Sequence, residues 1–388
     1  MASCKLCGEE DCDRHGFFLG KTVTLEEFSG SSPPEVFIGR WNYPNIYTGI
    51  LSPTEYGDTQ VLSSPELWHE RKLSVEDILR NRNKLIYGRT QSNIRKLQTR
   101  FLSVLQEVAI THKPIATEFT LKRPIIKHEE QTANVPLIAH AAEVQNVRLE
   151  ENPTVQKKVE YLVHDDAVKS RDAILELDKV GIATSSISKL LSAGLLGMRV
   201  RRKLVPTRWS ITAVDDTLSK EKLENIRLYS EVSEISVFSA EYLGNHYEFL
   251  LLPGTFAFEV IEISMKNFGV LHDYESHFSR KRYADEVTGA YYVNRLALTE
   301  YLERVRKQGQ CLVMREIRPE YSAPLGVGIL RQVSREAFSR KQRIFSTLQE
   351  AFADIQTRLQ LQIDNFLQKS WILQHYGKQK KLKDFFLD

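Results

Sequence analysis

The alternation of apolar and polar positions predicts a mixed α/β body. From residue 35, short β-branched and aromatic runs are separated by Gly39, Pro44 and Gly49, which is typical of strands joined by turns. The stretch 204–263 predicts further strands, TRWSITAV, ISVFSAEYL, YEFLLLP and FAFEVIEISM, and QCLVMREI adds one more. Several separate strands are therefore expected.

Helical signals lie between these runs. Ser74, followed three residues later by Asp77, fits a helix N-cap with an acidic first turn. Residues 153–197 also look helical, with a break at Gly181, and 289–308 predict another helix. Residues 98–128 mix helix and strand signals.

The two ends of the chain differ from the body. Residues 1–16 are too short for a core, and 17–34 are expected to be a linker that closes with the sequence SGSSPP. The body then covers 35–329. Residues 330–376 contain no Gly or Pro, and their apolar residues recur at steps of three and four, which predicts one long C-terminal helix. A coiled-coil seam is the alternative. Residues 377–388 are expected to be a flexible basic tail.

The composition restricts the class of protein. The chain has 388 residues, 42% of them hydrophobic, and a net charge of +3, which argues against a wholly basic, histone-like binder. A local basic patch can still meet DNA phosphates. No run of 18 apolar residues and no signal-peptide core is present, so we expect a soluble cytoplasmic protein with no membrane partner.

Three of the four cysteines lie near the start. Cys4, Cys7, Cys12 and His15 form C-x2-C-x4-C-x2-H, and thiolates and imidazole are the ligands of structural Zn²⁺. Since this segment has no core of its own, bound metal would supply its folding free energy. The alternative is an incidental grouping at a terminus. Cys311 is expected to be a buried apolar filler.

The last residues carry the most specific pattern. Gln379, Leu382, Phe385 and Phe386 form Q-x-x-L-x-x-F-F, which resembles the peptide motif of proteins that bind the replication sliding clamp. One helical turn places the three apolar side chains on a single face, which can enter an apolar groove. The alternative is a terminal helix whose aromatic side chains pack on the chain's own body.

A basic run leads into paired acids in the middle of the chain. Residues 199–209 include Arg202, Lys203 and Arg208, which could contact phosphate, and Asp215–Asp216 follow. Asp215 is a candidate ligand for Mg²⁺ or Mn²⁺, or a general base. The alternative is a solvated basic face followed by a helix cap.

A second polar run covers 272–283. His272 is a candidate acid, and Arg280 and Lys281 are candidate phosphate ligands, as is Arg40 in an earlier strand-turn. A salt-bridged surface loop is equally compatible with this run. Of Glu259 and Glu262, at most one can face a given cleft if both lie on a strand.

Five blocks together resemble the archaeal Nre family of DNA repair proteins over nearly the full length. They are FIGRWNYPNIYTGILSP, KLVPTRWSITAVDD, LPGTFAFEVIE, RKRYADEVTGAYYVNR and MREIRPEYSAPLGV, and the N-terminal knuckle and C-terminal clamp peptide recur in that family. The resemblance implies DNA repair and clamp binding. It also implies a hydrolase that cleaves phosphodiesters or removes a 5′-adenylate left by failed ligation. It transfers no catalytic residue.

Three hypotheses follow from the sequence. The first is an enzyme of DNA ends, in which Arg208 and Lys281 bind phosphate, Asp215 is metal ligand or base, and His272 is the acid. The second is a non-catalytic DNA-binding adaptor recruited by the clamp. The third is an RNA-processing factor.

Overall fold

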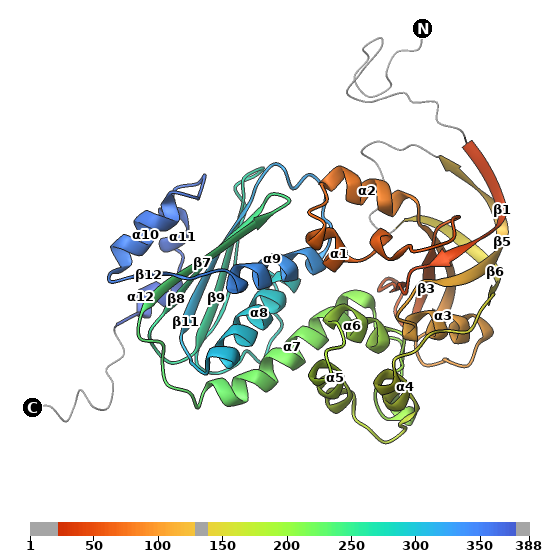
Figure 1. Ribbon diagram of the computed structural model, residues 1–388, viewed down its shortest axis with the longest axis horizontal. Helices are drawn as coiled ribbons and strands as arrows, with labels where there is room; N and C mark the ends of the chain where they lie inside the picture. The colour runs from red at the N-terminus through yellow and green to blue at the C-terminus, as the bar shows by residue number, and fades with distance from the viewer. Residues whose placement is uncertain (1–21, 129–138, 378–388) are drawn as a thin grey trace, which may run out of the picture. The chain divides into compact units, whose positions relative to one another are not determined.

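The computed structural model describes residues 22–128 and 139–377, which form two compact units, Met1–Ile211 and Thr212–Asp388. Each unit contains one six-stranded sheet with helices (Figure 1), so the expected mixed α/β fold is confirmed. The region 35–329, predicted as one body, is divided between the units. The predicted zinc knuckle and clamp peptide lie outside the described residues. Within the described part, no helix combines the length and apolar character needed to cross a bilayer.

The sheet of the first unit has the order β1-β5-β6-β4-β3-β2. Only β4 and β6 pair in parallel; the other neighbours are antiparallel. The strands are β1 (Thr22–Ser32), β2 (Val36–Ile38), β3 (Asn45–Ser52), β4 (Ile86–Asn93), β5 (Ile115–His128) and β6 (His140–Leu149).

Short helices accompany this sheet. The region 153–197 is helical as predicted, and Gly181, at φ +80°, separates two of its helices. Ser74 caps its helix in a capping box with Asp77, which confirms the predicted helix start. The helices are α1 (Pro65–Glu70), α2 (Val75–Asn83), α3 (Arg100–Ile110), α4 (Lys157–His164), α5 (Ser170–Lys179) and α6 (Thr184–Ser192), with short 3-10 turns at Gln60–Leu62 and Arg199–Arg201.

The predicted linker 17–34 is wrong for its described part, because β1 pairs with β5 and the rings of Phe28 and Phe119 stack 4.5 Å apart. The small residues near its end have a packing reason. A Cβ on Gly30 would lie 2.4 Å from the carbonyl oxygen of Pro53, so glycine permits the chain to pass closely there.

The sheet of the second unit has the order β10-β9-β11-β8-β7-β12, with β9 and β11 in parallel. Its buried central strands include QCLVMREI, as predicted. The strands are β7 (Ile235–Tyr242), β8 (Asn245–Leu252), β9 (Ala257–Ser264), β10 (Val270–Glu275), β11 (Gln310–Ile317) and β12 (Arg343–Phe345).

Helices cover both faces of this second sheet (Figure 1). On one face, α8 (Gly289–Val305) and α9 (Val327–Ser339) pack on the strands; for example, Phe338 of α9 contacts Phe238 and Phe249. On the other face, the C-terminal elements share a buried apolar core with β7, β8, β9 and β11. The predicted helix at 289–308 is confirmed as α8.

The predicted continuous helix over 330–376 is wrong. After α9, the chain forms β12, α10 (Leu348–Gln356), α11 (Asp364–Leu367) and α12 (Trp371–His375). Thr347 and Glu350 form a capping box that starts α10 anew. Ile355, Ile363 and Phe366 do face the core, as the apolar spacing indicated, but from different elements.

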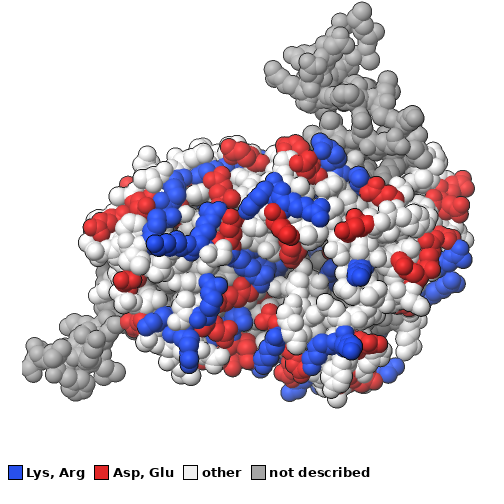
Figure 2. Space-filling view, in the orientation of Figure 1, with Lys and Arg blue, Asp and Glu red and all other residues white. Residues whose placement is uncertain are grey.

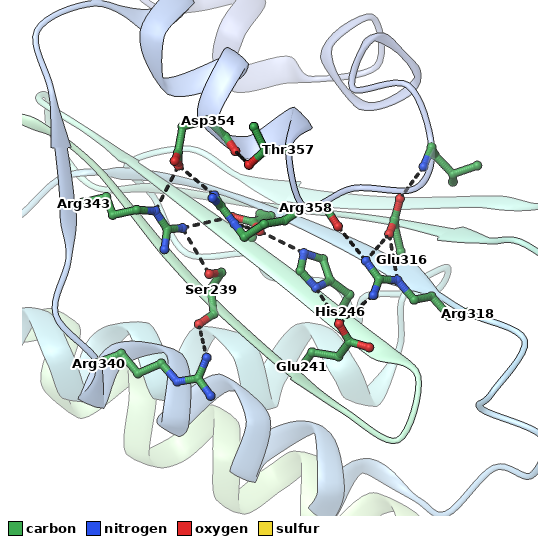
Figure 3. A network of polar contacts seen from close by, with 12 residues as sticks. Ser239, Glu241, His246, Glu316, Arg318, Arg340, Arg343, Asp354, Thr357 and Arg358 are labelled. Atoms are coloured by element: carbon green, nitrogen blue, oxygen red, sulfur yellow. Dashed lines mark hydrogen bonds and ion pairs between the residues drawn. The ribbon is translucent and has the colours of Figure 1, made fainter.

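A polar network also holds these C-terminal elements on the sheet (Figure 3). Glu248 of β8 is fully buried, and it accepts hydrogen bonds from Arg358 at 2.7 and 2.9 Å and contacts His246 at 2.9 Å. Glu316 of β11 accepts from the backbone N–H of Leu361 at 2.7 Å and pairs with Arg318. Each buried carboxylate is therefore satisfied by several donors.

The segment TRWSITAVDD was predicted as a strand, but it begins the helix α7 (Thr207–Ile226). Its β-branched residues suggested a strand. However, Ser210, Val214 and Leu218 are all buried at a spacing of four, which is helical, and Pro206 precedes the helix start. The unit boundary falls inside this helix.

Candidate functional site

Asp215 lies in a buried ion pair. Its carboxylate accepts hydrogen bonds from the Arg331 guanidinium of α9 at 2.8, 2.9 and 3.1 Å, and both side chains are almost fully buried. Burial raises the pKa of Asp215, while the positive charge of Arg331 opposes that shift. A carboxylate so enclosed cannot reach a substrate, so the predicted role of Asp215 as base or metal ligand does not fit its position.

Asp216 also joins a network of paired charges. It contacts Lys220 at 2.7 Å and the buried guanidinium of Arg295 on α8. Arg295 in turn binds Glu275 at the end of β10 at 3.0 Å. Across the described residues, no group of three or more His, Cys, Asp and Glu side chains is arranged to hold a metal ion. Asp216 thus connects α7 with α8 and, through Arg295, with β10.

Arg280 closes the loop that follows β10. Its guanidinium contacts Asp273 at 2.8 Å and the carbonyl oxygens of Tyr274 and Tyr283 at 3.0 and 3.1 Å. Because these contacts use its donors internally, Arg280 fixes the loop rather than presenting a free phosphate ligand. The neighbouring Lys281 is exposed.

Of the two residues predicted to transfer protons, Asp215 and His272, it is His272 on β10 that keeps access to solvent. Its Nε2 lies 2.6 Å from a carboxylate oxygen of Glu259, and its side chain is 24% exposed. In the hairpin register, Tyr274 lies opposite Glu259, and His272 lies two residues before Tyr274 on the same strand. The side chains of His272 and Glu259 therefore lie on the same face of the sheet. In the described part of the chain, no residue hydrogen-bonds to the other ring nitrogen of His272.

The Glu259 carboxylate is held from behind. It accepts hydrogen bonds from the Ser370 hydroxyl at 2.6 Å and from the backbone N–H groups of Trp371 and Ile372 at 2.5 and 3.0 Å. These donors satisfy the carboxylate oxygens and fix the direction of the side chain. Since Glu259 is an acceptor only, His272 donates through Nε2, and a neutral ring then presents Nδ1 as a proton acceptor.

Aromatic rings extend from His272. Its ring stacks on Tyr274 with centroids 5.6 Å apart, and Tyr274 stacks on Trp371 at 4.9 Å. Tyr274 is 41% exposed. Edge strand β10 thus presents a histidine paired with a carboxylate beside a flat aromatic surface. Such a surface can stack against a planar group of a ligand.

A second histidine lies in the loop after β10. The pKa of His277 is lowered by partial burial and by the positive charge of Arg227. Arg227 donates to the Ser279 hydroxyl at 2.9 Å, which ties the loop to the end of α7. His277 is therefore held in its neutral form more strongly than an exposed histidine.

The predicted DNA-binding residues of the first unit have different environments. Arg40 and Lys203 are exposed, and so is Arg208 at the start of α7. Arg202 instead donates to the carbonyl oxygens of Gly197, Val163 and Asp165 at 2.7, 2.8 and 2.9 Å. These contacts join loops of the first unit, so Arg202 has a structural role there.

The structure thus separates the predicted constellation. Asp215 belongs to the layer with α8 and α9, whereas His272 and Glu259 lie on the opposite face of the same sheet. Glu259 was noted in the sequence only as one of two acids, and its pairing with His272 depends on the hairpin register. On the face that Figure 2 shows, Lys and Arg side chains are interspersed with Asp and Glu.

Two family descriptions match the chain. "Archaeal Nre, N-terminal" matches residues 6–268, and "Archaeal Nre, C-terminal" matches residues 275–385. The chain belongs to the archaeal Nre family. The family resemblance drawn from the sequence blocks is thereby confirmed.

Curated relatives of this Nre family member come from two archaea. DNA repair protein NreB of Archaeoglobus fulgidus is 34% identical and is aligned over 98% of this chain and 97% of its own length. DNA repair protein NreA of the same organism is 32% identical over 99% of this chain and 98% of its own. NreA of Haloferax volcanii is 31% identical over 94% and 90%. No solved structure matches the chain.

Proposed function

We propose that this protein is a DNA repair protein that hydrolyses a bond at DNA ends and is recruited by the sliding clamp. The names of its three relatives support the repair role, because each is aligned over at least nine-tenths of its own length. The terminal pattern Gln379, Leu382, Phe385 and Phe386 supports clamp recruitment. Cys4, Cys7, Cys12 and His15 would hold a structural Zn²⁺.

The paired side chains of His272 and Glu259 carry the catalytic part of this proposal. With Nε2–H donated to Glu259, Nδ1 takes a proton from a water molecule as its oxygen attacks phosphorus. The bond from phosphorus to the leaving oxygen then breaks, and the imidazolium returns a proton to that oxygen. Cleavage of a phosphodiester and removal of a 5′-adenylate are both reactions of this class. Lys281 would attract the phosphate.

The test compares turnover on nicked, flapped and 5′-adenylated DNA with labelled ends, measured in chelator and with added Mg²⁺ or Mn²⁺. We expect His272→Gln to lower turnover about 100-fold or more, as for loss of a general base, without changing the melting curve. His164→Gln is the matched control, because His164 is exposed and, within the described part of the chain, its Nδ1 contacts only the backbone oxygen of Glu160. Full turnover in His272→Gln would show that His272 is not a catalytic residue.

A non-catalytic DNA-binding adaptor is the second candidate function. It is favoured by the ion pairs of Asp215 and Asp216 with Arg331 and Arg295, because these acids support the fold rather than line an open site. An adaptor would bind the same DNA substrates and show no turnover in the wild-type protein, in chelator or with either metal.

A further inference from the structure

Three large aromatic side chains of the first unit are exposed and take no part in the site above. Trp41 is 75% exposed, and Tyr43 and Trp209 are each 46% exposed. The Tyr43 and Trp209 rings lie 5.5 Å apart, although the two residues are far apart in the sequence. Grouped exposed aromatic rings usually mark a binding surface, because leaving them in water is unfavourable.

The backbone around these rings holds them in place. The turn before β3 has Asn42 at φ +61°, and the N–H of Asn45 donates to the Asn42 carbonyl at 2.8 Å. At the end of β2, the N–H of Ile38 donates to the hydroxyl of Thr207 at 2.9 Å, and Thr207 is two residues before Trp209. The rings are thus presented from a fixed frame, which lowers the entropy cost of binding.

Two further segments join the same frame through backbone hydrogen bonds. The N–H of Ile94 donates to the Pro44 carbonyl at 3.1 Å, and the N–H of Leu204 donates to the Ile94 carbonyl at 2.9 Å. The residues next to these contacts, Arg95, Lys96 and Lys203, are exposed cations.

The charged side chains of the segments around these rings are all positive. Residues 36–54, 78–106 and 179–214, which supply the rings and the joined segments, contain no Asp or Glu. The guanidinium of Arg40 lies 4.7 Å from the centre of the Trp41 ring. Cations beside open aromatic faces match a ligand with phosphates along its backbone and flat bases along its side.

We propose that this aromatic–cationic surface, formed by Arg40, Trp41, Tyr43, Arg95, Lys96, Lys203, Arg208 and Trp209, binds the unpaired nucleotides of single-stranded DNA. Bases stack on the rings, and the cations meet the phosphates. In duplex DNA the base faces are already stacked, so the rings distinguish unpaired from paired DNA. The choice of DNA over RNA rests on the proposed function; the preference for unpaired nucleotides does not.

The test titrates the full chain with a fluorescent oligothymidylate and with a blunt duplex of equal length, in chelator so that no substrate is consumed. We expect Trp41→Ala to weaken oligothymidylate binding about 5- to 150-fold, as for loss of a stacked base, and to leave duplex binding nearly unchanged. Trp41→Phe, which keeps a ring, should restore most of the affinity. Binding of both DNAs should fall with added salt.

Tyr161→Ala is the matched control. Tyr161 is also an exposed aromatic residue of the first unit, 62% exposed with Lys158 over its ring, but it lies beside Glu160. Unchanged oligothymidylate affinity in Trp41→Ala, or an equal loss in Tyr161→Ala, would overturn the stacking surface. Tighter binding of oligouridylate RNA than of oligothymidylate would overturn the choice of DNA. Turnover in His272→Gln is measured separately, so either proposal can fail alone.

Discussion

The Asp215–Arg331 pair gives the sharpest test of whether the central acids are structural or catalytic. Asp215→Asn keeps the shape of the side chain and removes its charge, which leaves the Arg331 guanidinium buried without its counterion. If the pair is structural, stability should fall whether or not the protein is an enzyme. If Asp215 were catalytic, turnover would fall while the fold stayed stable.

The expected magnitude follows from burial. Both side chains are at most 3% exposed, and removal of one partner from such a pair costs about 3–5 kcal/mol. For a unit the size of Thr212–Asp388, that corresponds to a fall in melting temperature of about 6 to 20 °C. Replacing both partners together, with Asp215→Leu and Arg331→Met, should recover most of the loss, since no uncompensated charge remains.

Circular dichroism melting of the full chain measures this effect. The matched control is Asp166→Asn, which breaks an Asp–Arg pair with Arg199 of similar 3.0 Å geometry on the surface, where both side chains are more than half exposed. That change should cost less than about 1 kcal/mol. A melting curve of Asp215→Asn that matches the wild type, together with a 100-fold loss of turnover, would refute the structural interpretation.

Three further predictions concern the ends of the chain and the C-terminal network. Elemental analysis should find about one zinc per chain, and Cys7→Ser should lose it. Burial raises the pKa of Asp354, but hydrogen bonds from Arg358 and Arg343 outweigh it and hold the pKa below its ordinary 3.8. The stabilisation by Asp354 is therefore present above pH 3.8 and is lost as the pH falls through the lower pKa of the folded protein. Urea unfolding should show the difference in stability between wild type and Asp354→Asn shrinking from pH 7 to pH 3. By calorimetry, a peptide of residues 378–388 should bind the sliding clamp with roughly micromolar affinity, and Phe385→Ala with Phe386→Ala should remove that binding.

Local signals in the sequence located several elements correctly. The capping pair Ser74 and Asp77 marked the start of α2, and the buried run around Cys311 marked β11. Cys311 is a free, fully buried cysteine, as expected, and burial raises the pKa of its thiol. In these cases the feature that sets the structure lies within a few residues of the pattern.

The errors arose where tertiary packing decides. The β-branched residues of the segment before Asp215 suggested a strand, but the burial of Ser210, Val214 and Leu218 at helical spacing overrides that propensity. Likewise, the lack of Gly and Pro after residue 330 did not preserve one helix, because the Thr347 capping box begins a new one. In both cases two local patterns favour different structures, and the packing of the segment on the sheet decides between them.

The candidate site shows the same limit. The sequence named both His272 and Glu259, but nothing in it states that they lie on one face of a hairpin, and the acids it favoured, Asp215 and Asp216, are paired with arginines distant in sequence. Residue chemistry identified groups able to transfer protons. Exposure and partners, which depend on the fold, decide which of them can act.

The family match and the structure also divide the chain differently, and the difference has a physical consequence. The N-terminal family region ends at residue 268, in the turn between β9 and β10, whereas the compact units meet at Ile211 and Thr212. A chain ending at 268 would keep β9 but lose both of its sheet neighbours, β10 and β11. The backbone N–H and C=O groups of β9 would then lack hydrogen-bond partners, and Glu259 would lack the residues that now contact its carboxylate. The second sheet therefore needs residues from both family regions. His272 lies in the gap between the two matches, and Ser370, which donates a hydrogen bond to Glu259, lies in the C-terminal region.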